Sequence, residues 1–108
     1  MRKALIVGIN DYSFGSLDGC IPDANRMYNS LSRDYDDSPN FTCKKLISSE
    51  ITIDIPTLKE NVIDLFSFDS DVALFYFSGH GSEPTDTSRA CLVTQDAKTF
   101  NEGLELDF

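Results

Sequence analysis

The chain has no tryptophan, a single histidine, and no long run of apolar or basic residues. Its longest apolar runs, residues 4–9 and 72–77, are too short to span a bilayer, which takes about 20 apolar residues. Its largest basic cluster is the pair Lys44 and Lys45, whereas binding a phosphate backbone requires several converging cations. A membrane span and a nucleic-acid partner are therefore both excluded. Because the N-terminus begins with a strand-like run and not with a leader, we expect a cytoplasmic protein.

Cysteine is also scarce, and its spacing matches no known framework. Cys20, Cys43 and Cys91 cannot all pair within one chain, and their spacing fits neither a zinc motif nor a redox motif. With His80 as the only imidazole, a zinc site would need an unusual set of ligands. The sequence therefore predicts reduced thiols and no metal or other cofactor.

The composition that remains is typical of a small globular domain. The 108 residues are 41% hydrophobic and 25% charged, which suits one domain with a small core. The 18 acidic and 9 basic side chains give a formal net charge of −9.

Apolar runs alternate with amphipathic segments along the chain. Residues 4–9 and 72–77 are unbroken apolar runs, the pattern of strands buried on both faces. Residues 45–48 and 90–94 are expected to form two shorter strands. Strands that alternate with helices predict an α/β fold with a parallel sheet.

Two helices are expected between the first three strands. The first opens at Pro22 and has apolar residues at helical spacing, namely Ala24, Met27, Tyr28 and Leu31. The second is expected to begin with a capping box at residues 57–60. One stripe of this second helix carries the apolar side chains Leu58, Val62, Leu65 and Phe66.

Groups that perform chemistry in such sheets gather on the loops at the carboxyl ends of the strands. Two loops qualify, and we expect both at the same edge of the sheet. The loop after residues 4–9 offers Asn10, Asp11, Tyr12, Asp18, Cys20 and Asp23. The loop after residues 72–77 offers Ser78, His80 and Ser82.

His80 is the sharpest single candidate. Gly79 and Gly81 remove side chains from around an imidazole at the end of a core strand, and proton transfer needs such access. A tight turn that happens to hold a histidine explains the same residues. Gly81 is also a candidate to offer its backbone N–H to a developing oxyanion.

Two other features have simple explanations. Residues 8–12 superficially resemble the glycine turn of a dinucleotide site, but no G-x-G-x-x-G follows and the loop is acidic where a pyrophosphate would lie. Asp23 stands at the start of the first helix, where a carboxylate is favourable on electrostatic grounds alone. That role is compatible with binding a ligand.

Three segments in register carry a family resemblance. ALIVGINDY at residues 4–12, LDGCIPDA at 17–24 and FYFSGHG at 75–81 resemble the large-subunit half of caspase-like cysteine peptidases, in particular the metacaspases and their bacterial relatives. The resemblance implies a caspase-like three-layer α-β-α fold with a mostly parallel sheet. Residues 1–108 would then be the N-terminal part of a single peptidase domain. The implied activity is endopeptidase cleavage by a histidine–cysteine dyad, in which the thiolate attacks a peptide carbonyl.

The resemblance also assigns roles to single residues. His80 matches the family histidine, and Gly81 matches the residue whose N–H helps to stabilise the oxyanion. Asp23 matches the acid that lines the pocket for a basic P1 side chain, and Ser78 matches a further pocket residue. Cys20 matches a loop cysteine beside the pocket.

The departure from the family concerns the nucleophile. In the family, the nucleophilic cysteine lies on the next core strand, in an Asp-x-Cys-x-Ser-Gly type of segment, and this sequence ends at Phe108 before reaching it. Cys43 and Cys91 are expected to pack in the core, whereas Cys20 is expected in a loop on the His80 edge. The chain alone is therefore expected to be inactive. Its expected partners are a protein or peptide substrate and the remainder of the peptidase domain.

The resemblance also raises the question of calcium, because many metacaspases are activated by calcium at a cluster of acidic residues. Asp107 matches one of these acids, but Arg89 stands where another is expected. Calcium activation therefore stays open, and we predict no cofactor.

Two alternatives to an enzyme remain. One is a catalytically inactive caspase-like interaction module in a signalling assembly. The other is a flavodoxin-like ligand binder.

Overall fold

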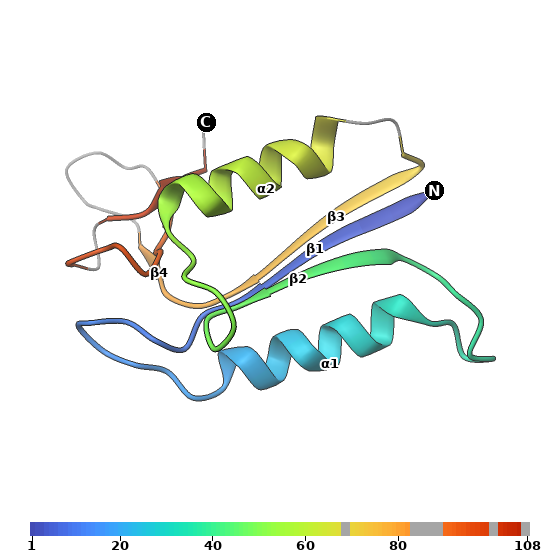
Figure 1. Cartoon of the computed structure of the whole chain (residues 1–108), viewed down its shortest axis with the longest axis horizontal. Coiled ribbons are helices and arrows are strands. Elements are labelled where there is room, and N and C mark those ends of the chain that lie inside the picture. The colour runs from blue at the N-terminus through green and yellow to red at the C-terminus, as the bar shows by residue number, and fades with distance from the viewer. Residues whose placement is uncertain (68–69, 83–89, 100–101, 107–108) are drawn as a thin grey trace.

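Three parallel strands form the main sheet of the structure, a computed structural model that describes residues 1–67, 70–82, 90–99 and 102–106. The strands are β1 (Arg2–Gly8), β2 (Thr42–Ile47) and β3 (Val72–Ser78). Their order, β2-β1-β3, places β1 in the middle (Figure 1). The register aligns Gly8 at the end of β1 with Ile47 of β2 and Ser78 of β3. The three carboxyl ends therefore lie at one edge of the sheet.

Two helices cover opposite faces of this sheet. They are α1 (Cys20–Ser32) and α2 (Ile55–Ser67), and Figure 1 shows the strands between them. The resulting three-layer arrangement confirms the predicted α/β class. No helix within the described residues is long and apolar enough to cross a membrane.

β1 supplies the centre of the core by presenting apolar side chains to both helices. Leu5 and Val7 belong to the cluster that includes the buried residues of α2, whereas Ala4 and Ile6 belong to the cluster that includes Ala24 of α1. Each of these four residues is at most 2% exposed. Since alternate side chains of a strand point to opposite faces, this burial confirms the strand predicted from the unbroken apolar run. Complete burial of a Leu or Val side chain contributes about 1.5–3 kcal/mol.

α1 begins at Cys20 and not at the predicted Pro22. Its N-terminal N–H groups are capped from outside the helix, because the Asn10 Oδ1 atom accepts hydrogen bonds from the N–H groups of Cys20 and Ile21 at 2.9 and 3.2 Å. The predicted apolar face is confirmed by the packing of Ala24, Met27, Tyr28 and Leu31 in the cluster beneath α1.

Gly8 allows α1 to approach the end of β1 closely. A Cβ atom at this position would lie 2.8 Å from the Ala24 Cβ and 2.8 Å from the Cys20 carbonyl oxygen. Both distances are well below van der Waals contact, so any larger residue would push the helix away from the sheet.

α2 begins at Ile55, and Asp54 is its N-cap. The Asp54 carboxylate accepts the Thr57 N–H at 2.9 Å, and hydrogen bonds from Thr57 hold the pKa of Asp54 below its usual value. The predicted capping box at residues 57–60 is therefore wrong. Phe66, which belongs to the predicted apolar stripe, does not join the core, because its side chain is 58% exposed. The other predicted core positions of this helix, Leu58, Val62 and Leu65, are buried.

A second, antiparallel sheet follows the parallel one. It contains β4 (Gly81–Ser82), β5 (Cys91–Leu92) and β6 (Leu104–Glu105), in the order β4-β5-β6. The fourth strand predicted at residues 90–94 is therefore shorter and does not join the parallel sheet. After β5, the side chains of Gln95 and Asp96 accept the backbone N–H groups of Ile53, which precedes α2, and of Ile55, the first residue of α2.

Candidate active site at the carboxyl edge of the sheet

The strand order reverses beside β1, because β2 lies on one side of it and β3 on the other. In open α/β sheets, ligands and catalytic groups collect at the carboxyl ends beside such a switch point. Here the segment after β1 meets the end of β3, and the Ile9 N–H donates to the Ser78 carbonyl oxygen at 2.9 Å. The prediction that the loops after β1 and β3 share one edge is confirmed.

The imidazole of His80 lies against the loop after β1. Its Nε2 atom is 3.0 Å from the carbonyl oxygen of Gly15. Because a carbonyl oxygen can only accept, this contact places the ring proton on Nε2 and makes Nδ1 the basic nitrogen of the neutral ring. The ring also packs against Tyr12 and Phe14, with centroids 4.7 and 5.7 Å away. These contacts fix both the orientation and the tautomer, as a general base requires.

Tyr12 connects His80 to the segment that follows β5. The Tyr12 side chain is buried, and its hydroxyl accepts the His80 N–H at 3.1 Å and donates to the Val93 carbonyl oxygen at 2.8 Å. Burial raises the pKa of Tyr12 to about 12, so the phenol stays a neutral donor near pH 7. The sequence placed Tyr12 in the candidate loop but gave it no role. No local signal could have done so, because its partners lie 68 and 81 residues further along the chain.

The two glycines that flank His80 differ in what they permit. A Cβ atom at Gly79 would lie 2.6 Å from the Tyr12 hydroxyl and 3.0 Å from the Phe77 ring, so Gly79 makes room for the phenol. Among the described residues, a Cβ atom at Gly81 would meet only the Cys91 carbonyl oxygen, at 3.8 Å. The described part of the chain therefore leaves space beside Gly81.

A polar network holds the start of the loop after β1. Besides capping α1 through its side chain, Asn10 donates its backbone N–H to the Ser48 Oγ atom at 3.0 Å. The Ser48 hydroxyl in turn donates to the Asp11 carboxylate at 2.7 Å, and the Gln95 amide donates to the Asp11 carbonyl at 3.1 Å. Asn10 and Asp11 therefore anchor the loop that contacts His80. Sequence reasoning missed Ser48 and Gln95, which lie far from this loop in the chain.

The predicted pocket residues lie on different elements. Ser78 ends β3 beside Gly8, directly before the His80 turn. Asp23 lies in the first turn of α1, where its carboxylate pairs with the Arg26 guanidinium. The Asp23 side chain is 45% exposed and therefore remains open to solvent.

Cys20 does not lie in a loop, and that prediction is wrong. It is the first residue of α1 and only 9% exposed, because the start of the helix packs on Gly8. Cys91 is buried in β5, and Cys43 of β2 packs against the cluster beneath α1, as predicted. None of the three is in a disulfide.

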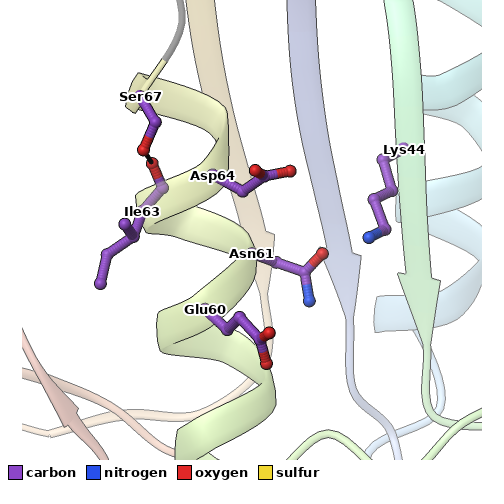
Figure 2. Close-up of a pocket in the computed structure, with 6 residues that line it drawn as sticks. All are labelled: Lys44, Glu60, Asn61, Ile63, Asp64 and Ser67. Carbon is purple, nitrogen blue, oxygen red and sulfur yellow. Dashed lines mark hydrogen bonds between the residues drawn. The ribbon is translucent and has the colours of Figure 1, made fainter.

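A hollow of about 470 Å³ lies between α2 and β2, and it contains none of the predicted site residues. Its lining consists of Lys44, Glu60, Asn61, Ile63, Asp64 and Ser67. Figure 2 shows Asn61 and Asp64 pointing from α2 toward Lys44 on β2. Because no imidazole or thiol lines this hollow, the His80 edge remains the better candidate for catalysis.

Arg89 and Asp107, which the resemblance singled out, lie outside the described residues. Within the described ranges, no group of three or more His, Cys, Asp or Glu side chains is arranged to hold a metal ion.

Comparison with known proteins gives a consistent family match. The family model described as Caspase domain matches residues 1–105. Metacaspase-1 of Candida glabrata is 34% identical over 92 residues, which cover 79% of this chain and 23% of that protein. Metacaspase-1 of Plasmodium falciparum is 33% identical over 95 residues, which cover 79% of this chain and 15% of that protein. Metacaspase-1 of Kluyveromyces lactis is 30% identical over 92 residues, which cover 79% of this chain and 21% of that protein. The chain therefore spans less than a quarter of the length of each of these relatives.

Proposed function

The chain belongs to the Caspase domain family, and from this premise we propose that it carries the histidine of a cysteine endopeptidase. One observation carries the proposal. The Gly15 carbonyl holds Nε2 of His80, so that Nδ1 is the basic nitrogen of a fixed imidazole at the switch point of the sheet. This is the state in which a histidine can accept a proton from a thiol.

In the proposed reaction, Nδ1 of His80 removes the proton of a cysteine thiol. The thiolate attacks the scissile carbonyl carbon and forms a thioester, while the imidazolium gives its proton to the leaving amine. The imidazole then removes a proton from the water that attacks the thioester carbonyl; the C–S bond breaks, and the imidazolium returns the proton to the cysteine sulfur, which restores the thiol. We assign the Gly81 N–H to the oxyanion, and the space that the described residues leave beside its Cα supports this assignment.

We place the nucleophile on a strand beside β3 and not among Cys20, Cys43 and Cys91. Cys20 and Cys91 are buried, whereas a nucleophile must be accessible to its substrate. Cys43 lies near the start of β2, at the opposite end of that strand from the carboxyl edge. β3 is an outer strand of the parallel sheet among the described residues, so a further parallel strand beside it would end close to His80. The 108-residue chain by itself is accordingly expected to be inactive.

We further propose cleavage after basic P1 residues, with Asp23 as the recognising carboxylate and with Ser78 and Cys20 beside the pocket. The pairing of Asp23 with Arg26 supports this, because it shows that the carboxylate accepts a guanidinium. Both side chains are well exposed, and exposed ion pairs contribute only about 0–1 kcal/mol. A P1 arginine or lysine can therefore replace Arg26 at little cost.

The test is a library of fluorogenic peptides that differ at P1, assayed with the full-length protein that contains this chain. We expect cleavage after Arg and Lys, which Asp23→Ala reduces by at least about tenfold without lowering the melting temperature. Arg26→Ala is the matched control and should retain the preference. Robust cleavage after Asp, or indifference to Asp23→Ala, would contradict the specificity, and no cleavage of any peptide would contradict the peptidase.

One observation favours a second candidate, a catalytically inactive module that binds partner proteins. An apolar hollow of about 530 Å³ lies between α2, β3 and the small sheet, and exposed Phe66 and Leu106 are part of its lining. Apolar surface of this kind is typical of protein contacts. If the full-length protein cleaves no peptide but forms a stable complex with a partner protein, this candidate would be favoured.

A further inference from the structure

At one end of the hydrogen-bond ladder between β4 and β5, the side chain of Tyr12 is inserted between the two backbones. Gly81 pairs with Leu92 and Ser82 with Cys91, so the next opposed residues are His80 and Val93. Residues of a hydrogen-bonded antiparallel pair exchange two N–H···O bonds. One bond is direct, from the Val93 N–H to the His80 carbonyl oxygen at 2.9 Å.

The second bond of this pair runs through a phenol. The His80 N–H donates to the Tyr12 hydroxyl at 3.1 Å, and that hydroxyl donates to the Val93 carbonyl oxygen at 2.8 Å. The hydroxyl therefore occupies the place between the two backbones. Gly79 makes the insertion feasible, because a Cβ atom there would lie 2.6 Å from the hydroxyl oxygen.

We propose that Tyr12 is a positioning residue for His80, whose hydroxyl widens the end of the ladder and thereby sets the imidazole at hydrogen-bond distance from the Gly15 carbonyl. The catalytic part of this inference rests on the proposed function of His80 as a base. Tyr12 itself exchanges no proton in the reaction, since burial keeps its phenol neutral well above pH 7. Its ring also packs on the imidazole, with centroids 4.7 Å apart, so one side chain controls both the backbone and the ring of His80.

The first experiment observes the imidazole directly and does not depend on activity. His80 is the only histidine, so its ring nitrogens are unambiguous in NMR spectra of the ¹⁵N-labelled chain. In the wild type we expect the proton on Nε2. Tyr12→Phe keeps the ring but removes the hydroxyl, so the Nε2 tautomer should lose population and exchange of the His80 amide should accelerate by about fivefold, the factor associated with one net hydrogen bond.

Two further variants make this result specific. Tyr76→Phe removes a hydroxyl from a partly buried tyrosine that packs against the other core cluster, and it should leave both readouts at their wild-type values. Gly79→Ala retains the phenol but displaces it, and it should reproduce the effect of Tyr12→Phe. Wild-type tautomer and amide exchange in both Tyr12→Phe and Gly79→Ala would overturn the proposal.

The second experiment measures peptide cleavage by the full-length protein. If the wild type is active, Tyr12→Phe should lower kcat by about tenfold with KM unchanged, because the base is displaced and substrate contacts are retained. An unchanged kcat alongside an altered tautomer would overturn the catalytic role of Tyr12. An inactive wild type would instead refute the proposed function, while the NMR result still decides whether Tyr12 positions His80.

Discussion

Replacing Asn10 by alanine is expected to destabilise the protein by about 1–2 kcal/mol, although Asn10 lies outside any helix or strand. Its Oδ1 atom accepts two N–H groups of the first turn of α1, those of Cys20 and Ile21, at 2.9 and 3.2 Å. Loss of an N-cap acceptor costs about 0.5–2 kcal/mol. The upper half of that range applies here because both bonds are partly buried and water replaces them poorly.

Urea and thermal unfolding, followed by circular dichroism, measure this cost. For a domain of this size, each kcal/mol lowers the melting temperature by about 4–8 °C. Asn10→Asp keeps an acceptor and should retain most of the stability. Asn29→Ala is the control, since Asn29 is exposed on the same helix and should change stability by less than about 0.5 kcal/mol. If Asn10→Ala costs no more than Asn29→Ala, the capping argument is refuted.

Three further predictions address packing, pH and association. Gly8→Ala should cost about 1–3 kcal/mol in urea unfolding, because the new Cβ overlaps Ala24 and Cys20. Gly15→Ala, whose Cβ would have no atom of the described residues within 4 Å, should be neutral, and equal losses would contradict this. The raised pKa of Tyr12 favours the neutral phenol in the folded state, so its contribution to stability is present below pH 10 and is lost as the pH rises toward about 12. Tyr12→Phe should flatten this alkaline loss, and an unchanged pH profile of unfolding would refute the assignment. We expect the isolated chain to self-associate through the apolar hollow beside the exposed Phe66, and Phe66→Ser should reduce this association in sedimentation without lowering stability. A monomeric wild type, or association unchanged by Phe66→Ser, would contradict this.

The sheet and its helices were predictable because their signals are local. The unbroken apolar run at residues 4–9 is buried on both faces because β1 lies between two neighbouring strands and two helix layers. The similar run at residues 72–77 predicted the same burial wrongly, because β3 is an outer strand among the described residues and is only partly buried. The spacing of Ala24, Met27, Tyr28 and Leu31 likewise determines which face of α1 packs on the sheet.

The helix starts were predicted less well because their caps are supplied by neighbouring structure. α1 is capped by Asn10 from the preceding loop, and α2 by Asp54, which lies just ahead of the segment that resembles a capping box. Phe66 continues the apolar stripe of α2 in the sequence, but its side chain is exposed at the hollow between α2, β3 and the small sheet.

The sequence predicted the edge of the sheet at which the candidate site lies, and it pointed to His80 as a candidate. It did not predict the contacts that hold His80 in place. Glycines around a histidine at the end of a strand are visible in the sequence. The contacts of the imidazole with Gly15 and of its backbone with Tyr12 depend on how two distant loops meet, and no spacing rule encodes them. Cys20 was misplaced for the same reason, since its burial follows from the close approach of α1 to Gly8.

The central claim is that His80 is the base of a cysteine peptidase, and one measurement tests it most directly. It compares the rates at which the full-length protein and its His80→Ala variant cleave a fluorogenic peptide with arginine at P1. We expect a rate lower by about a hundredfold to ten-thousandfold in the variant, with the melting temperature unchanged. Cleavage by His80→Ala at the wild-type rate would contradict it.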